Sequence, residues 1–133
     1  ALMLTGLYAA LCALLVFVLS LRIALLRKRL RIGIGDGGDA ALARAIRAQA
    51  NAIEYVPLVL VMLLIAENNG ATAAFVHACG AGLLVARVLH AVGLSGTAGV
   101  SFGRFWGILL TWAILLVLGA QLLWNFVAAM RIA

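Results

Sequence analysis

The sequence predicts an all-α integral membrane protein folded as a bundle of four transmembrane helices. Two observations support this class: 67% of the 133 residues are hydrophobic, and only 11% are charged. Soluble domains carry about 45–50% apolar and about 25% charged residues, so this chain has too few polar residues to cover a soluble core. A β-barrel is not expected, because the apolar residues run continuously instead of alternating with polar ones.

The length of the chain fits four crossings of a bilayer. The hydrocarbon core is about 30 Å thick, which requires about 20 helical residues per crossing. We expect a single domain over residues 1–133, with spans at about 2–26, 40–66, 71–94 and 104–129. The glycine-rich residues 33–39 have the composition of a loop, and Asp39 at their end is the expected N-cap of the second span.

Positive charge predicts the orientation of these spans. Nine of the ten basic residues belong to the first and third loops or to the helix ends beside them, and Arg131 belongs to the other side. The positive-inside rule then places these two loops in the cytoplasm and both termini on the non-cytoplasmic side. A nucleic-acid partner is not expected, because the cations lie at the ends of apolar runs and not on a solvated basic face.

The second span carries a polar stripe. Arg44, Arg47, Asn51 and Glu54 are spaced by 3, 4 and 3 residues. At about 100° per residue they fall within an arc of about 80° on one helix face. Because charged side chains within a membrane normally face a bundle interior or a wet cavity, we expect this stripe to point inward.

Other cations approach the same layer of the predicted bundle. Arg87 and His90 lie one helical turn apart in the third span, Arg104 opens the fourth span, and Arg22 and Arg27 end the first. This excess of positive charge indicates an anionic ligand. Two simpler interpretations stay open: the cations near helix ends can snorkel to the interface, and the stripe can be a polar network that fixes helix packing.

The remaining polar and reactive residues predict structural roles. We expect His77 to be a satisfied interior or interface histidine, Gln121 and Asn125 to join helices, and Trp112 to be a packing residue. Cys12 and Cys79 lie far apart within apolar stretches. They lack metal-ligand spacing, so no metal site is expected.

The segment from Arg44 to Leu58 contains the pattern Arg-x-x-Arg-Ala-Gln-x-Asn-x-x-Glu-Tyr-x-Pro-Leu. This pattern resembles the signature of the MAPEG superfamily, the membrane-associated proteins of eicosanoid and glutathione metabolism. The resemblance extends over the whole chain. The chain resembles the bacterial members of this superfamily, which are similar to the microsomal glutathione transferase and the leukotriene-forming synthase.

The resemblance implies a homotrimer in the bacterial inner membrane, with glutathione held between subunits near the cytoplasmic face. It implies that Arg104 stabilises the glutathione thiolate as the catalytic residue. The ligand-binding residues that it implies are Arg27, Arg47, Asn51, Glu54, Tyr55, Arg87 and His90. The second substrate would be a lipophilic electrophile or hydroperoxide that arrives from the bilayer between spans one and four.

The resemblance therefore favours a glutathione transferase or peroxidase acting on hydrophobic substrates. Two other functions stay open. One branch of the family binds lipids without catalysis, so a lipid-binding scaffold is the first alternative. A small multidrug transporter is the second, although such proteins use a membrane-embedded acid in their first span and this chain has none there. A thiol other than glutathione is also possible.

Overall fold

The computed structural model describes residues 2–96, 99 and 101–132. Within this part of the chain there are four helices: α1 (Leu4–Leu30), α2 (Ala40–Asn68), α3 (Ala73–Gly96) and α4 (Phe102–Ile132). Each of the four is long and apolar enough to cross a membrane. The prediction of an all-helical protein with four candidate membrane spans is thereby confirmed.

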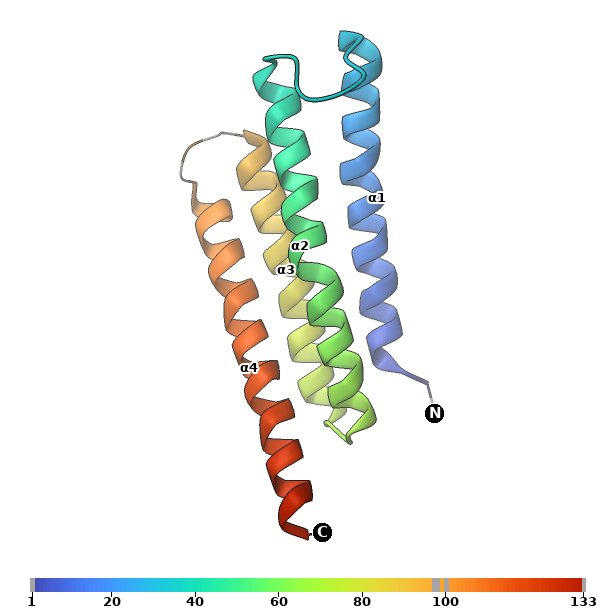
Figure 1. Cartoon of the computed structure of the whole chain (residues 1–133), viewed down its shortest axis with the longest axis vertical. Helices are drawn as coiled ribbons and strands as arrows, with labels where there is room; N and C mark the ends of the chain where they lie inside the picture. Colours follow the sequence, from blue (N-terminus) through green and yellow to red (C-terminus); the bar gives the residue numbers. More distant parts are fainter. Residues whose placement is uncertain (1, 97–98, 100, 133) are drawn as a thin grey trace.

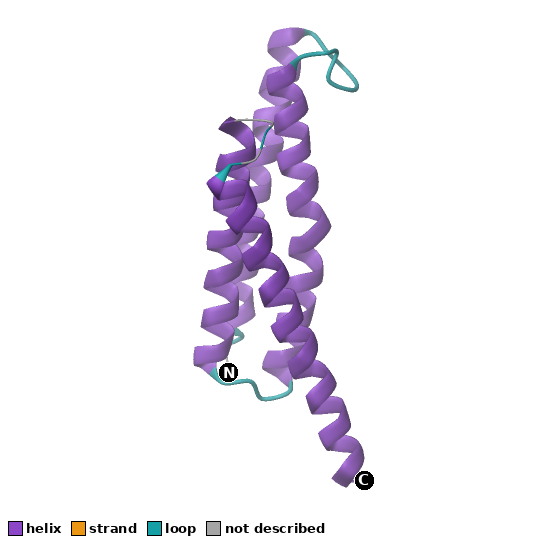
Figure 2. Ribbon diagram, turned by 90° about the vertical axis from the view of Figure 1, so that its left-hand side faces the viewer, coloured by secondary structure: helices purple, strands orange, loops and turns teal. Residues whose placement is uncertain are grey.

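The helices form an open arc with α2 and α3 between α1 and α4 (Figure 1). Among the described residues, α1 packs against α2 and α3, and α4 packs against the same two helices, but α1 and α4 make no contact. The α1–α2 connection, the end of α3 and the start of α4 lie at one end of the bundle, and the start of α1 and the end of α4 lie at the other. The last part of α4 projects beyond the other helices (Figure 2).

The helix boundaries differ from the predicted spans mainly at α1 and α4. α1 continues through Arg27, Lys28 and Arg29, because Arg and Lys are good helix formers and interact favourably with a helix C-terminus. It ends at Leu30, and the C-cap residue Arg31 has a left-handed φ of 57°. α2 begins at Ala40, and its Leu42 amide donates to the Asp39 carboxylate over 2.8 Å, which confirms the predicted N-cap.

Close packing of α3 on α4 positions the start of α4. A side chain at Gly103 would place its Cβ 2.4 Å from the Leu89 carbonyl oxygen, and one at Gly107 would lie 2.6 Å from the Ala86 carbonyl oxygen. Glycine is therefore required at both positions, as is common where two membrane helices approach closely. This approach places Arg104, one residue after Gly103, beside α3.

Four residues hold α1 at the end of the bundle that carries the termini, and we call them the α1 anchor: Thr5, Tyr8, Glu67 and His77. The Glu67 carboxylate at the end of α2 accepts hydrogen bonds from the Leu4 amide (2.6 Å), the Thr5 amide (2.8 Å) and the Thr5 hydroxyl (2.5 Å). The Tyr8 hydroxyl and His77 Nδ1 are 2.7 Å apart. A carboxylate from α2 thus caps the N-terminus of α1, whose own N-cap residue makes no side-chain bond.

Candidate functional site

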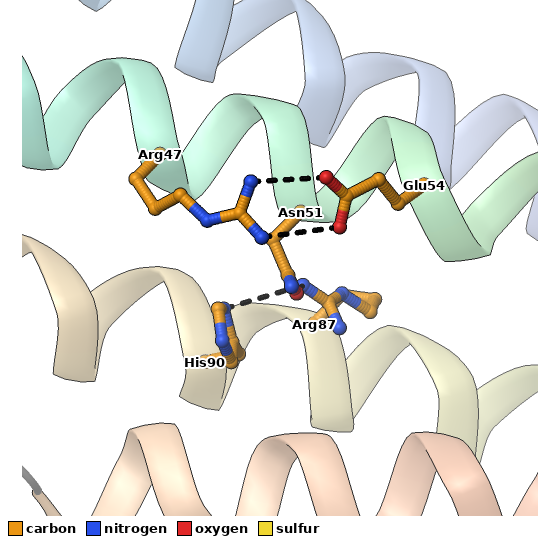
Figure 3. Close-up of polar contacts among 5 residues, drawn as sticks. All are labelled: Arg47, Asn51, Glu54, Arg87 and His90. Atoms are coloured by element: carbon orange, nitrogen blue, oxygen red, sulfur yellow. Dashed lines mark hydrogen bonds and ion pairs between the residues drawn. The ribbon is translucent and has the colours of Figure 1, made fainter.

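Arg87 is the centre of a buried polar network in the middle of the bundle. Only 1% of this residue is exposed. Its Nη2 donates to Asn51 Oδ1 on α2 over 2.5 Å and to His90 Nδ1 over 3.2 Å, and its Nη1 donates to Thr111 Oγ1 on α4 over 3.4 Å. Asn51, Arg87, His90 and Thr111, which we call the Arg87 network, therefore link α2, α3 and α4. Figure 3 shows the first three of these residues.

The hydrogen-bonding capacity of these groups fixes their roles. Arginine has no acceptor, so His90 Nδ1 accepts and carries no proton in this contact. The oxygen of Asn51 is used by Arg87, which leaves its amide NH2 group to donate elsewhere. Arg87 Nε is buried and has no hydrogen-bond partner among the described residues. The network is thus incomplete within one chain.

Arg47 and Glu54 form an ion pair on the outer surface of α2. Arg47 Nη1 and Nη2 lie 2.9 and 3.2 Å from the two Glu54 carboxylate oxygens (Figure 3). Their side chains are 54% and 48% exposed. The prediction that the whole stripe points inward is therefore wrong within one chain: Asn51 is buried, whereas Arg47 and Glu54 are exposed on the outer surface of α2. Because the stripe covers about 80° of the surface of α2, one edge of it can face the other helices while the other edge faces away from them.

Three arginines line one open pocket at the end of the bundle that carries the α1–α2 connection. The pocket has a volume of about 260 Å³ and is lined by Ala40, Ala43, Arg44, Arg47, Leu94 and Arg104. Arg44 Nε is buried without a hydrogen-bond partner. Ala40 belongs to the first turn of α2, where unpaired backbone amides add partial positive charge. The pocket is therefore strongly cationic, and we call it the arginine pocket.

Tyr55 on α2 contacts both Arg87 on α3 and Trp112 on α4. The Arg87 Cζ atom is 5.8 Å from the centroid of the Tyr55 ring, which is a cation–π distance. The Trp112 indole donates a hydrogen bond to the Tyr55 hydroxyl oxygen over 3.1 Å. Four of the predicted residues, namely Asn51, Tyr55, Arg87 and His90, are thus joined by contacts, and Arg47 and Glu54 form a separate pair on α2.

Arg27 lies apart from these groups within one chain. Its Nη1 donates to the Gly35 carbonyl oxygen over 2.7 Å in the α1–α2 connection. Arg22, also on α1, donates to the Ser95 hydroxyl near the end of α3. The first helix therefore brings no guanidinium into the arginine pocket of its own chain.

The remaining polar and reactive residues agree with their predicted roles only in part. Gln121 and Asn125 bond to each other along α4 over 2.9 Å, and so they do not join helices within one chain. His77 is exposed and pairs with Tyr8. Cys12 and Cys79 are free and buried. The described residues contain no group of three or more His, Cys, Asp or Glu side chains that could hold a metal.

Sequence reasoning missed the contributions of Thr111 and Trp112, whereas Arg44 was predicted as part of the stripe. Arg44 lines the pocket one turn before Arg47. Thr111 is a polar residue in a long apolar run, which was a weak signal. The contact of Trp112 with Tyr55 spans 57 residues and depends on the relative rotation of α2 and α4. No pattern in the sequence gives that rotation.

Comparison with known proteins supplies the family. The MAPEG family pattern matches residues 5–124. The chain is 39% identical over 122 residues to the protein named "Inner membrane protein YecN" in Escherichia coli strain K12, with 92% of each chain covered. The same identity and coverage hold for the protein of that name in Escherichia coli O6:H1. The chain is a member of the MAPEG family.

Proposed function

We propose that this protein is a glutathione transferase or peroxidase that joins glutathione to lipophilic electrophiles, or reduces lipophilic hydroperoxides with it, at the arginine pocket. The observation that carries the proposal is that Arg44, Arg47 and Arg104 line one pocket and that Arg47 pairs with the Glu54 carboxylate. Three guanidinium groups with one acid within reach form an anion site that also has a place for a cation.

The charges of glutathione match this arrangement. The tripeptide has two carboxylates and one ammonium group. Arginine binds carboxylates through two parallel hydrogen bonds, so Arg44 and Arg47 can hold the former. Glu54 can exchange part of its pairing with Arg47 for the ammonium group. The amide NH2 of Asn51 and the Tyr55 hydroxyl add neutral donors, while Arg87 and His90 hold Asn51 in place.

Arg104 supplies the chemistry in this proposal. A guanidinium group does not lose its proton at neutral pH, so it acts by stabilising the thiolate and not as a base. The thiol proton leaves to water, and the sulfur then attacks the electrophile. A carbon–sulfur bond forms as the leaving group departs with its electron pair. With a hydroperoxide, the thiolate sulfur attacks the distal oxygen, the O–O bond breaks and the alcohol leaves after taking up a proton. A second glutathione thiol then attacks the sulfur of the resulting sulfenic acid, which gives the disulfide and water.

Assembly of subunits would complete the site, and the family resemblance indicates a homotrimer. Arg47 and Glu54 are half exposed on an apolar helix, where an ion pair open to lipid is costly. A neighbouring chain can cover them. Because α1 and α4 of one chain make no contact, a passage between these two helices would have to form between subunits. Arg27 would reach the ligand from the neighbouring chain.

The location that we propose is the bacterial inner membrane, with both termini on the non-cytoplasmic side. The relatives named as inner membrane proteins support this location. The last turn of α1, beside the α1–α2 connection, contains the basic residues Arg27, Lys28 and Arg29, which supports the orientation. Glutathione is made in the cytoplasm, and the arginine pocket lies at this same end.

The first prediction tests catalysis directly. Single-turnover absorbance of the glutathione thiolate should show a signal in the wild-type protein, and Arg104→Leu should abolish it. Removal of one charge-stabilising donor costs about 100- to 1,000-fold in turnover in other enzymes, and we expect a loss of that size here. Arg131→Leu, at the far end of α4, is the matched control and should behave as wild type.

Two outcomes would favour the alternatives. A specific fatty-acid ligand bound without thiolate formation would identify a lipid-binding scaffold. Proton-coupled uptake by vesicles would indicate a transporter, although α1 contains no acidic residue and Glu54 is paired with Arg47. If wild-type protein gives no thiolate signal with glutathione or with another low-molecular-weight thiol, the enzymatic proposal fails.

A further inference from the structure

Trp112 reaches across from α4 to Tyr55 on α2, one of the residues of the proposed glutathione site. Its indole Nε1 donates to the Tyr55 hydroxyl oxygen over 3.1 Å. Trp112 is 47% exposed, so burial of its ring in the core does not explain where it lies. The hydrogen bond gives this side chain a specific partner, which a residue that only fills space would not need.

A second contact from the same region holds the ring of Tyr55. Arg87 lies over its face, with the Cζ atom 5.8 Å from the ring centroid. Arg87 is in turn bonded to Thr111, the residue that precedes Trp112 on α4. The phenol is therefore held at its face through Arg87 and at its oxygen by Trp112, and α4 contributes to both contacts.

The bond from Trp112 decides what the Tyr55 hydroxyl can offer to a ligand. An indole N–H is a donor only, so the phenol oxygen is the acceptor in this contact. Within the described part of the chain, Tyr55 makes no other hydrogen bond, and its O–H remains available to donate. A hydrogen bond accepted by the oxygen also polarises the O–H and strengthens it as a donor.

We propose that Trp112 is a positioning residue of the glutathione site, which fixes Tyr55 as a donor to an anionic acceptor of the ligand. The inference rests on the proposed function. Tyr55 and its neighbour Glu54 then have opposite tasks: Glu54 accepts from the ammonium group, and Tyr55 donates to a carboxylate or to the thiolate. This division would orient the tripeptide along α2.

Binding measurements on the full-length protein in detergent test the inference. Trp112→Phe keeps an aromatic ring and removes the N–H donor. A hydrogen bond contributes about 0.5–1.5 kcal/mol, so the Kd for glutathione should rise by about 2- to 10-fold. Tyr55→Phe should raise the Kd at least as much. The double variant should be no weaker than Tyr55→Phe alone, because Trp112 acts through that hydroxyl.

Trp124→Phe is the matched control, since Trp124 also lies on α4 and is 64% exposed. It should leave the Kd unchanged. The inference is overturned if Trp112→Phe behaves like this control, or if its effect adds in full to that of Tyr55→Phe. A purely structural role would lower the melting temperature without this loss of additivity.

A spectroscopic measurement separates this inference from the proposed function. The chain has three tryptophans, so its ¹H–¹⁵N spectrum has three indole signals, and Trp112→Phe identifies one of them. That signal should move in Tyr55→Phe and on addition of glutathione. If the wild-type protein binds no glutathione, the proposed function fails, and the indole signal decides the pairing alone. An unmoved signal in Tyr55→Phe overturns the placement of Tyr55 by Trp112.

Discussion

The α1 anchor and the Arg87 network are both polar clusters inside apolar helices, yet they differ in one respect. In the α1 anchor, both oxygens of Glu67 accept hydrogen bonds, and Tyr8 is paired with His77. In the Arg87 network, Arg87 Nε is buried without a partner. Beside it, the Arg47–Glu54 pair is half exposed. The first cluster is complete within one chain, and the second is not.

This difference separates a structural role from a binding role. A cluster whose donors and acceptors are matched fixes the helices that contribute to it and has nothing to offer a ligand. In a cluster with unmatched groups, each buried polar group without a hydrogen-bond partner lowers the stability of the fold, and an added partner would remove this cost. Variants of the α1 anchor should therefore change stability alone. Variants of the Arg87 network should change stability and ligand binding together.

The largest effect should come from Asn51→Leu. This change removes the acceptor that lies 2.5 Å from Arg87 Nη2 and leaves a buried guanidinium without its closest partner. A hydrogen bond to a charged group contributes about 1.5–3 kcal/mol, so we expect the free energy of unfolding in mild detergent to fall by about 3 kcal/mol. Glutathione affinity should be lost as well.

The double variant Asn51→Leu/Arg87→Met sharpens this test. Because it also removes the uncompensated charge, it should recover part of the lost free energy of unfolding. It should not recover glutathione binding. A double variant that is less stable than Asn51→Leu would contradict the view that the charge of Arg87 requires Asn51.

A smaller effect is expected from Glu67→Ala. This change removes three hydrogen bonds at the start of α1, including the cap of its N-terminus. Loss of a helix cap costs about 0.5–2 kcal/mol, and we expect about 2 kcal/mol because the lost group is charged and makes several bonds. Urea unfolding in detergent measures this change, with Asn68→Ala as the control. A large change in glutathione affinity would break the distinction between the two clusters.

The smallest effect should come from Tyr8→Phe, which keeps the ring and removes one hydrogen bond to His77. We expect the free energy of unfolding to fall by about 1 kcal/mol, measured in the same way. His77→Phe should have a similar effect, and the two changes together should not add. Full additivity would show that the contact contributes nothing to stability.

Much of the fold could be predicted because membrane spans depend on properties that a sequence carries locally. Long apolar runs and glycine-rich connections gave the four helices, and Asp39 marked the start of α2. The end of α1 was predicted too early, because its basic residues are also good helix formers. The Glu67 cap was missed, because it joins residues 62 and 63 positions apart that no local pattern connects.

The sequence predicted which residues form the candidate site more completely than it predicted which way their side chains face. The spacing of Arg47, Asn51 and Glu54 placed them on one face of α2, but it could not tell which edge of that face is covered by α3. That depends on the rotation of α2 within the bundle. The pairing of Trp112 with Tyr55 depends on the same rotation, and so it became visible only in three dimensions.

The cap on α1 has a consequence for the opposite end of that helix. A slide of α1 by one turn, about 5.4 Å, would break every bond that Glu67 makes to its first residues, so the helix has a single axial setting. With 27 residues, α1 transmits this setting over about 40 Å. The position of Arg22 along the bundle axis, and with it the contact between Arg22 and Ser95, is therefore set by the Glu67 carboxylate at the opposite end of the bundle.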